Sequence, residues 1–201
     1  MTTRHVLFSA LGIVGALTAI CTPVHANDYR EKGKSTEIAG SAISVIPPRD
    51  WNRLEIKPGK FAETWTLDGE QLNDVTFYGG VESGKTLVRE RDKKRDPLPK
   101  FLDGMLLVEI PELLQGTYRA YKKISGFEVT NSAPGKFLGR DGVHFSYQYL
   151  DEDDLPRKGE ARAVLVDKKL YMVTFDAPRL HYFDQTVDDY RALAEAAKLS
   201  N

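Results

Sequence analysis

Residues 170–178 read Leu-Tyr-Met-Val-Thr-Phe-Asp-Ala-Pro, and the pattern of their side chains is the strongest indication of the fold. Successive side chains of a β-strand point to opposite faces of a sheet, so Leu170 and Met172 share one face, opposite Tyr171 and Val173. Both faces are apolar, whereas an antiparallel sheet with one wet face alternates between apolar and polar residues. The sequence therefore predicts a sheet that is covered on both faces.

This stretch closes a series of four strand-like runs, which are residues 127–130, 143–150, 161–166 and 170–175. Short polar links, 151–159 and 167–169, join the last three runs. Links of this length are too short for a parallel crossover, so the runs predict an antiparallel meander.

The sequence before the meander carries further strand patterns. They are residues 38–46, which stop at Pro47-Pro48, the alternating stretch 61–67, and residues 75–78 with 86–88 as an expected hairpin partner.

Two helices complete the predicted fold. Pro111 suits the first turn of a helix, and Gly126 suits its end. A second helix is expected to open near Thr186, with Asp189 three residues on as a weak capping box. Two helices and two apolar sheet faces predict an α+β domain, an antiparallel β-sheet flanked by helices in an α/β/α sandwich.

The first 26 residues have the layout of a secretory signal peptide. Arg4 precedes an apolar run, residues 6–20, and Val24-His25-Ala26 offers small residues at a cleavage site. We expect a signal peptide at 1–26, a flexible arm at 27–35 and one domain at 36–201, in the periplasm or secreted. The alternative is a lipid anchor on Cys21, although Ile20 does not suit a lipoprotein signal.

Composition excludes several classes of function. Without the leader the chain carries 27 basic and 29 acidic residues, which argues against nucleic-acid binding because that needs a strongly basic face. Cys21 is the only cysteine, so the mature chain has no thiol for a disulfide, a nucleophile or a thiolate metal site. No cofactor and no transmembrane segment of the mature chain are expected.

The two ends of the domain resemble the PsbP-like superfamily, which includes DcrB-type bacterial envelope proteins. The strand that ends at Pro47-Pro48 and is followed by Trp51 is similar to its opening, and residues 170–178, followed by Tyr182-Phe183, are similar to its ending. Residues 97–114 resemble a bacterial envelope branch with no assigned activity. The resemblance, over residues 36–200, implies an antiparallel sheet between helices and a binding or assembly role without a catalytic motif.

Residues 79–86, Gly-Gly-Val-Glu-Ser-Gly-Lys-Thr, match the phosphate-binding pattern G-x-x-x-x-G-K-S/T. In a nucleotide-binding protein a long helix begins at the Lys-Thr pair. Residues 89–96 are charged and Pro97 would end such a helix early, so it could not pack on a sheet. We therefore interpret the motif as a β-hairpin with Ser83-Gly84 in its turn, and we predict no nucleotide hydrolysis.

Other polar groups give weak signals. The acidic stretch 151–154 is either a solvated hairpin tip or a calcium loop, but it lacks the glycine and distal glutamate of an EF-hand. His144 and His181 are the histidines outside the leader, too few for a zinc site without carboxylate ligands. The basic stretch 85–100 is either a solvated loop or a contact for anionic lipid or polymer.

An exposed subset of the aromatic residues would mark a binding surface. The candidate surface is Trp51, His181, Tyr182 and Phe183. The leading hypothesis is a non-enzymatic binding or assembly module of the cell envelope, whose partner is an envelope protein or cell-wall component. The alternative is a small periplasmic hydrolase that pairs Ser or Asp with His181.

Overall fold

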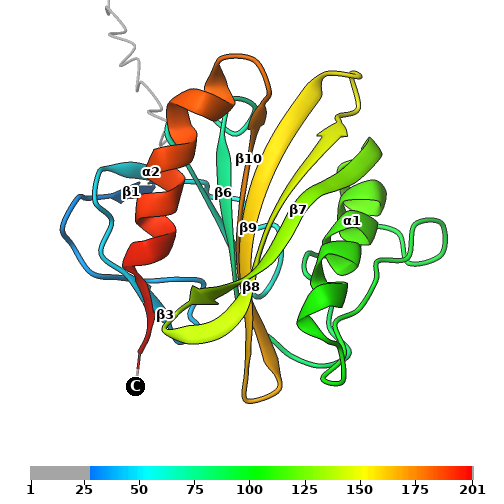
Figure 1. The fold of residues 1–201 in the computed structure, drawn as a ribbon, viewed down its shortest axis with the longest axis horizontal. Coiled ribbons are helices and arrows are strands. Elements are labelled where there is room, and N and C mark those ends of the chain that lie inside the picture. Colours follow the sequence, from blue (N-terminus) through cyan, green and yellow to red (C-terminus); the bar gives the residue numbers. More distant parts are fainter. Residues whose placement is uncertain (1–27, 201) are drawn as a thin grey trace, which may run out of the picture.

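The computed structural model describes residues 28–200, a mostly antiparallel β-structure with two short helices (Figure 1). The predicted signal peptide and Cys21 lie outside the described residues, so cleavage after Ala26 stays a prediction. The strands are β1 (Asp28–Arg30), β2 (Thr36–Glu37), β3 (Ile43–Val45), β4 (Trp51–Arg53), β5 (Ala62–Thr66), β6 (Asp74–Val81), β7 (Ser125–Phe137), β8 (Arg140–Leu150), β9 (Pro156–Val166), β10 (Lys169–Pro178) and β11 (Ala197–Leu199). The helices are α1 (Ile110–Tyr121), which follows a 3-10 turn η1 (Leu107–Glu109), and α2 (Tyr182–Ala196).

The strands form two sheets. The large sheet has the order β1-β4-β5-β6-β10-β9-β8-β7, and the small one has the order β11-β3-β2. The pairings β7–β8, β8–β9 and β9–β10 are antiparallel neighbours in sequence, which confirms the predicted meander. The meander strands are longer than their apolar runs, because β9 begins at Pro156, inside the expected turn, and β7 continues to Phe137.

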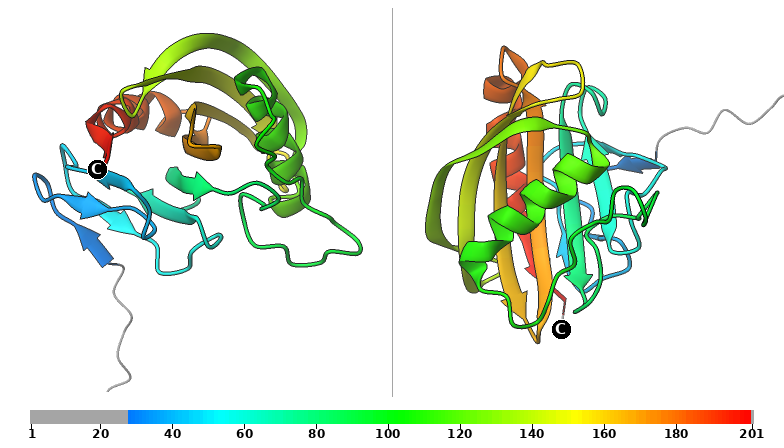
Figure 2. Two further views of the ribbon diagram at one scale, coloured as in Figure 1. Left: turned by 90° about the horizontal axis from the view of Figure 1, so that it is seen from below. Right: turned by 90° about the vertical axis from the view of Figure 1, so that its right-hand side faces the viewer.

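The strand β10 separates two apolar clusters. Leu170 and Met172 belong to the cluster that contains the buried face of α1, whereas Val173 and Phe175 belong to the cluster that contains the buried face of α2. The two helices lie on opposite sides of the molecule (Figures 1 and 2). Both faces of the central strands are therefore covered, as residues 170–178 predicted.

The expected α/β/α sandwich is correct only in its coarse form, a mostly antiparallel sheet with two short helices. On the α2 side the small sheet shares the covering role, since Ile43, Val45 and Ala197 lie in the same cluster as the helix. Residues 28–30, expected in a loose arm, form β1 and pair with β4 at the edge of the large sheet.

The second helix begins earlier than its capping pattern indicated. α2 starts at Tyr182, so Thr186 lies inside the helix and its hydroxyl donates to the carbonyl of Tyr182 at 2.8 Å. The buried face of α2 includes Val187, Tyr190 and Leu193.

The expected hairpin partner of β6 is also wrong. The chain does turn at residues 82–85, but Thr86 bridges to Lys100 and not to β6. The partners of β6 are β5 and β10. The segment between β6 and η1 instead forms a loop that projects beside α1 (Figure 1).

Candidate functional site

The four residues of the expected aromatic surface do not form one exposed patch. Trp51 is 1% exposed and lies in the core on the α2 side, and Phe183 is buried with it. Of the four, only His181 is exposed, while Tyr182 is half-buried with its ring edge-on to His181. Trp51, the first residue of β4, is thus a core residue, because its side chain lies in the same apolar cluster as residues of the small sheet and α2.

His181 does not form the dyad of the alternative hydrolase in the structure. Its Nδ1 lies 3.5 Å from the Gln185 side-chain amide, and none of its contacts among residues 28–200 is with a serine or a carboxylate. The other histidine, His144, has its Nε2 2.9 Å from the carbonyl oxygen of Lys136 in the neighbouring strand. That contact is structural.

The phosphate-loop motif has another role. Gly79 and Gly80 lie inside β6, and Lys85 follows a turn in which Gly84 has a φ of +78°. No helix begins at Lys85 within the described chain, because the next helical turn starts at Leu107. The motif therefore lacks the strand–loop–helix context that cradles phosphates.

The acidic turn 151–154 is held by its own first residue. Asp151 Oδ1 accepts hydrogen bonds from the backbone N–H groups of Asp153 and Leu155, at 3.1 and 2.9 Å. Among the described residues, no group of three or more His, Cys, Asp or Glu side chains is arranged to hold a metal ion. The turn does, however, border a cavity that the sequence did not reveal.

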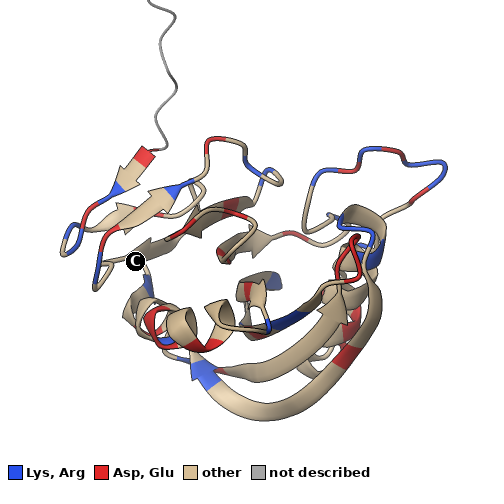
Figure 3. Ribbon diagram, turned by 90° about the horizontal axis from the view of Figure 1, so that it is seen from above, with Lys and Arg blue, Asp and Glu red and all other residues tan. Residues whose placement is uncertain are grey.

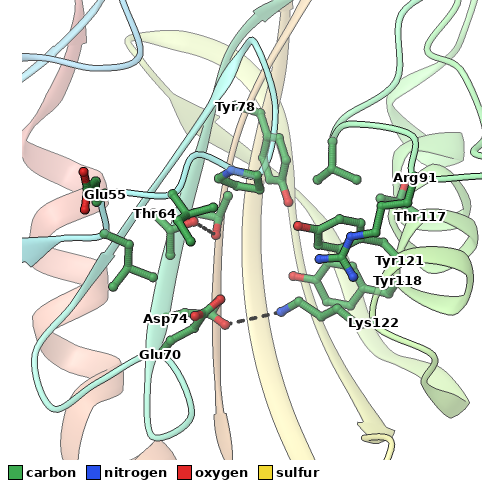
Figure 4. Close-up of a pocket in the computed structure, with 15 residues that line it drawn as sticks. Glu55, Thr64, Glu70, Asp74, Tyr78, Arg91, Thr117, Tyr118, Tyr121 and Lys122 are labelled. Atoms are coloured by element: carbon green, nitrogen blue, oxygen red, sulfur yellow. Dashed lines mark hydrogen bonds and ion pairs between the residues drawn. The ribbon is translucent and has the colours of Figure 1, made fainter.

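This cavity, the α1 cavity, has a volume of about 390 Å³ and lies between the C-terminal end of α1 and strands β5 and β6 (Figure 4). Its apolar and aromatic walls come from residues Leu54, Ile56, Pro58, Tyr78, Val88, Tyr118 and Tyr121. Its polar residues are Glu55, Thr64, Glu70, Asp74, Thr76, Arg91, Thr117 and Lys122. Apolar walls with a few convergent polar groups are typical of ligand pockets.

The turn between β5 and β6 positions Asp74 at the cavity. Asn73 is fully buried, and its Oδ1 accepts the backbone N–H of Leu67 at 2.8 Å while its Nδ2 donates to Asp68 at 2.6 Å. These bonds fix the turn, so the first residue of β6 points its carboxylate across the cavity toward α1.

A buried charge cluster connects α1 to the sheet at this point. Lys122 Nζ lies 3.3 Å from Asp74 Oδ2 (Figure 4). It also lies 3.5 Å from Asp176 Oδ2. Asp176 faces Asp74 in the β6–β10 register, and Tyr118 donates to Asp176 Oδ2. The Lys122 ammonium also lies 4.4 Å from the Tyr118 ring centroid, within reach of a cation–π contact.

The ionisable groups of this cluster are strongly perturbed. Burial raises the pKa of Asp74 to about 6, against the opposing effect of Lys122. Burial alone would lower the pKa of Lys122, but the charges of Asp176 and Asp74 outweigh it and hold that pKa well above its ordinary value. Burial, and next the charge of Asp176, raises the pKa of the Tyr118 hydroxyl. Perturbed groups in a cleft mark a candidate functional site.

The cluster is not fully satisfied. Asp74 Oδ1 and Asp176 Oδ1 are both buried and accept no hydrogen bond from any described residue. Leaving a buried acceptor without a donor costs roughly 1–3 kcal/mol. Asp74 lines the α1 cavity, but Oδ1 itself is buried, so a group that enters the cavity reaches this oxygen only when the carboxylate turns toward it.

A second cavity of about 250 Å³ adjoins the first and shares Glu70, Asp74, Arg91, Tyr121 and Lys122 with it. Its other charged residues are Asp151, Glu152, Asp153 and Arg157. Figure 3 shows this acidic β8–β9 turn beside the basic C-terminal end of α1. The acidic turn is therefore part of the surroundings of the α1 cavity.

Sequence reasoning missed this site because its parts come from distant segments. One signal was present: Asp176 interrupts a strand whose two faces are both apolar, and a buried carboxylate needs a charged or hydrogen-bonding partner. The identity of that partner depends on how α1 packs, which no local pattern encodes.

Comparison with known proteins places the fold. No protein-family model and no curated protein sequence matches the chain. The solution structure of the cyanobacterial PsbP protein CyanoP from Synechocystis is similar, with a TM-score of 0.55, 15% identity, and 92% of this chain and 99% of that chain covered. A Bacteroides thetaiotaomicron protein matches with a TM-score of 0.50 and 9% identity over 85% of this chain, which corresponds to 49% of that chain.

The Ran-binding protein Mog1p of Saccharomyces cerevisiae has a TM-score of 0.48 at 9% identity, with 85% of this chain and 97% of that chain covered. The CyanoP match confirms the resemblance seen in the sequence at the level of the fold, which is PsbP-like. At this identity the match shows the fold alone.

Proposed function

We propose that the protein is a non-enzymatic binding module of the cell envelope, and that its partner enters the α1 cavity. One observation carries this proposal: a cavity of about 390 Å³ with apolar and aromatic walls has a buried carboxylate, Asp74, whose Oδ1 has no donor among the described residues. The volume is in the range of sites that receive a small ligand or a side chain of a partner.

The polar groups of the cavity argue for binding and against catalysis. Thr64 and Thr76 share a hydrogen bond of 2.9 Å, and Thr117 donates to the carbonyl of Leu113 at 2.8 Å. Each of these hydroxyls is already engaged, so none is poised as a nucleophile next to a free base. The alternative hydrolase around His181 has no support in the contacts of that residue.

The envelope location rests on the predicted leader, residues 1–26, which directs the chain to the periplasm or out of the cell. No helix among residues 28–200 is both long enough and apolar enough to cross a bilayer. An envelope protein or a cell-wall component is therefore the proposed partner.

Photo-crosslinking tests the site of binding. Ile56 lines the α1 cavity and is 84% exposed, so a benzoyl-phenylalanine at position 56 would touch a bound partner. Val108 is a matched control: it is 72% exposed and precedes the N-terminal end of α1, whereas the cavity lies at the other end of this helix. The 12-residue helix α1 is about 18 Å long, and this length separates Val108 from the end of α1 that lines the cavity.

In the native cells we expect a discrete crosslinked species from position 56 and none from position 108. Equal crosslinking at both positions, or none at position 56, would contradict the proposed binding site.

A further inference from the structure

The charges around the α1 cavity do not balance. The two adjoining cavities are lined by six carboxyl residues, Glu55, Glu70, Asp74, Asp151, Glu152 and Asp153. The basic residues that line them are Arg91, Lys122 and Arg157. A cleft lined by one excess sign of charge attracts ligands of the opposite sign.

The three basic side chains are already engaged. Lys122 lies between Asp74 and Asp176, and the Arg157 guanidinium donates to the Gln71 carbonyl at 2.9 Å. Arg91 lies over the Tyr121 ring, with its guanidinium carbon 4.4 Å from the ring centroid. Two buried carboxylates thus share a single ammonium group, and each keeps a free oxygen.

The walls of the cavity also suit a cation. The side chains of Tyr78, Tyr118 and Tyr121 extend into it from β6 and from α1 (Figure 4). The π-face of a tyrosine attracts an ammonium or guanidinium group within about 6 Å of the ring centroid. Lys122 and Arg91 already occupy such positions at Tyr118 and Tyr121, so among the described residues Tyr78 is the ring of the three without a cation over it. The aliphatic residues Leu54 and Ile56 line the same cavity and can contact an alkyl chain.

The geometry of Asp74 distinguishes between the two kinds of cation. A guanidinium group pairs best with both oxygens of a carboxylate, but Asp74 Oδ2 is already engaged by Lys122 at 3.3 Å. Only Oδ1 is free, and a single acceptor suits the compact point charge of an ammonium group.

From these observations we infer that the α1 cavity takes a primary ammonium group on an aliphatic chain, presented by the envelope partner as a lysine side chain. This inference rests on the proposed function and names the chemistry of the partner. The ammonium group donates to Asp74 Oδ1, and its alkyl chain lies against the apolar wall.

Calorimetric titration with small probes tests the inference directly. The probes are Nα-acetyl-lysine methylamide, its norleucine analogue, which lacks the ammonium group, and its arginine analogue. We expect the lysine probe to bind about tenfold more tightly than either analogue, since a hydrogen bond to a charged group contributes that much or more. Equal binding of the norleucine probe would overturn the inference.

Two asparagine variants separate the cavity from the overall charge. Asp74→Asn removes the acceptor charge, whereas Asp141→Asn removes one exposed carboxylate that lies outside the cavity and pairs with Lys136. We expect Asp74→Asn to weaken the lysine probe by about tenfold and Asp141→Asn to leave it unchanged. An equal loss in both variants would show nonspecific attraction only.

The pH dependence of probe binding can be measured on the wild-type protein, so this test does not depend on the folding of a variant. Protonation of Asp74, whose pKa is raised to about 6, is expected to weaken binding of the lysine probe at pH 5 relative to pH 7.5. Binding that does not change between these pH values contradicts a role for the Asp74 carboxylate.

The source of the ammonium group is tested with the free diamine cadaverine and with the crosslinking assay. Tighter binding of cadaverine than of the lysine probe would overturn a partner lysine in favour of a free amine.

The crosslinking assay separates the inference from the proposed function. If Asp74→Asn abolishes the crosslink from position 56, the inference is supported. If the crosslink persists, the inference fails and the proposed function stands. If the lysine probe binds but no partner crosslinks, the proposed function fails.

Discussion

The hydroxyl of Tyr118 donates to Asp176 Oδ2 at 2.5 Å, although 58 residues separate the two in the sequence. This bond joins α1 to β10, and it lies beside the salt bridges of Lys122. The contact joins a helix and a strand, and neither local sequence pattern predicts that the two elements meet.

Removing that hydroxyl is expected to destabilise the fold. Tyr118→Phe removes the hydroxyl donor of a buried carboxylate and leaves it with Lys122 at 3.5 Å, so the free energy of unfolding should fall by roughly 1–3 kcal/mol. Tyr121→Phe is the control, because that hydroxyl makes no hydrogen bond with a described residue, and it should change stability by less than about 0.5 kcal/mol. Urea denaturation measures both; equal losses would show that the Tyr118–Asp176 bond contributes nothing.

Replacing the shared cation should cost more. Lys122→Met leaves Asp74 and Asp176 buried together without a positive charge, and breaking a buried pair typically costs about 3–5 kcal/mol. The neighbouring Lys123 pairs with Asp96 on the surface, so Lys123→Met should cost less than about 1 kcal/mol. Thermal and chemical denaturation at pH 7 compare the two, and similar losses would contradict the cluster.

The raised pKa of Asp74 makes a signed prediction about pH. The folded state holds the Asp74 proton up to about pH 6, whereas the unfolded chain releases it near the ordinary value of about 3.9. Between these values the native state binds more protons, so the contribution of Asp74 to the unfolding free energy falls as pH rises. Asp74→Asn removes this slope.

Asp141 supplies the opposite control. Its hydrogen bond to Lys136 lowers its pKa, so its contribution to stability is present above the unfolded pKa and is lost as pH falls. Unfolding free energies measured from about pH 2 to pH 7 cover both variants, with the Asp74 slope between about pH 4 and pH 6 and the Asp141 slope below about pH 4. A stability difference between wild type and Asp74→Asn that does not vary with pH would rule out the raised pKa.

The glycines of the phosphate-loop motif are expected to matter for packing. A Cβ on Gly79 would clash with the side chain of Ser41, whose hydroxyl donates to the carbonyl of Ile38. A Cβ on Gly84 would meet open space, although its positive φ makes a substitution strained by about 1 kcal/mol. Gly79→Ala should therefore destabilise the protein more than Gly84→Ala does, as measured by thermal melts.

The same motif is expected not to bind nucleotide. Neither the wild-type protein nor Lys85→Ala should bind ATP in calorimetry.

Processing of the leader can be checked on the native protein. Cleavage after Ala26 predicts a mature chain that begins at Asn27, which N-terminal sequencing would read directly. A blocked chain with an acylated Cys21 would instead establish the lipid anchor and reject the predicted cleavage site.

Periodicity predicted most of the fold because each strand and helix carries its own signal. Residues 170–175 showed two apolar faces, and short links fixed the antiparallel meander. The second half of β7 escaped because residues 131–136 lie on the edge of the sheet and are mostly exposed, so their side chains are polar or small and carry no alternation. The first residue of α2 was not predicted because the helix has no side-chain cap at its N-terminal end.

The candidate site was less predictable than the fold. An aromatic residue that follows a proline pair by three positions, such as Trp51, has the same local pattern whether it is buried or exposed, and here it is buried. Asp74 and Asp176 meet only through the register of β6 with β10, which lie far apart in sequence. Non-local pairing of this kind decides which charges share a cavity, and a single sequence does not encode it in any one segment.

The pairing of β11 with β3 affects when the chain can finish folding. Leu199 faces Ile43 in this pairing, so the small sheet closes only after nearly the whole chain has been synthesised. Contacts between such distant residues slow folding, because a long loop must be ordered before they form. Slow closure of this kind would suit export of an unfolded chain, which the signal peptide predicted at residues 1–26 requires.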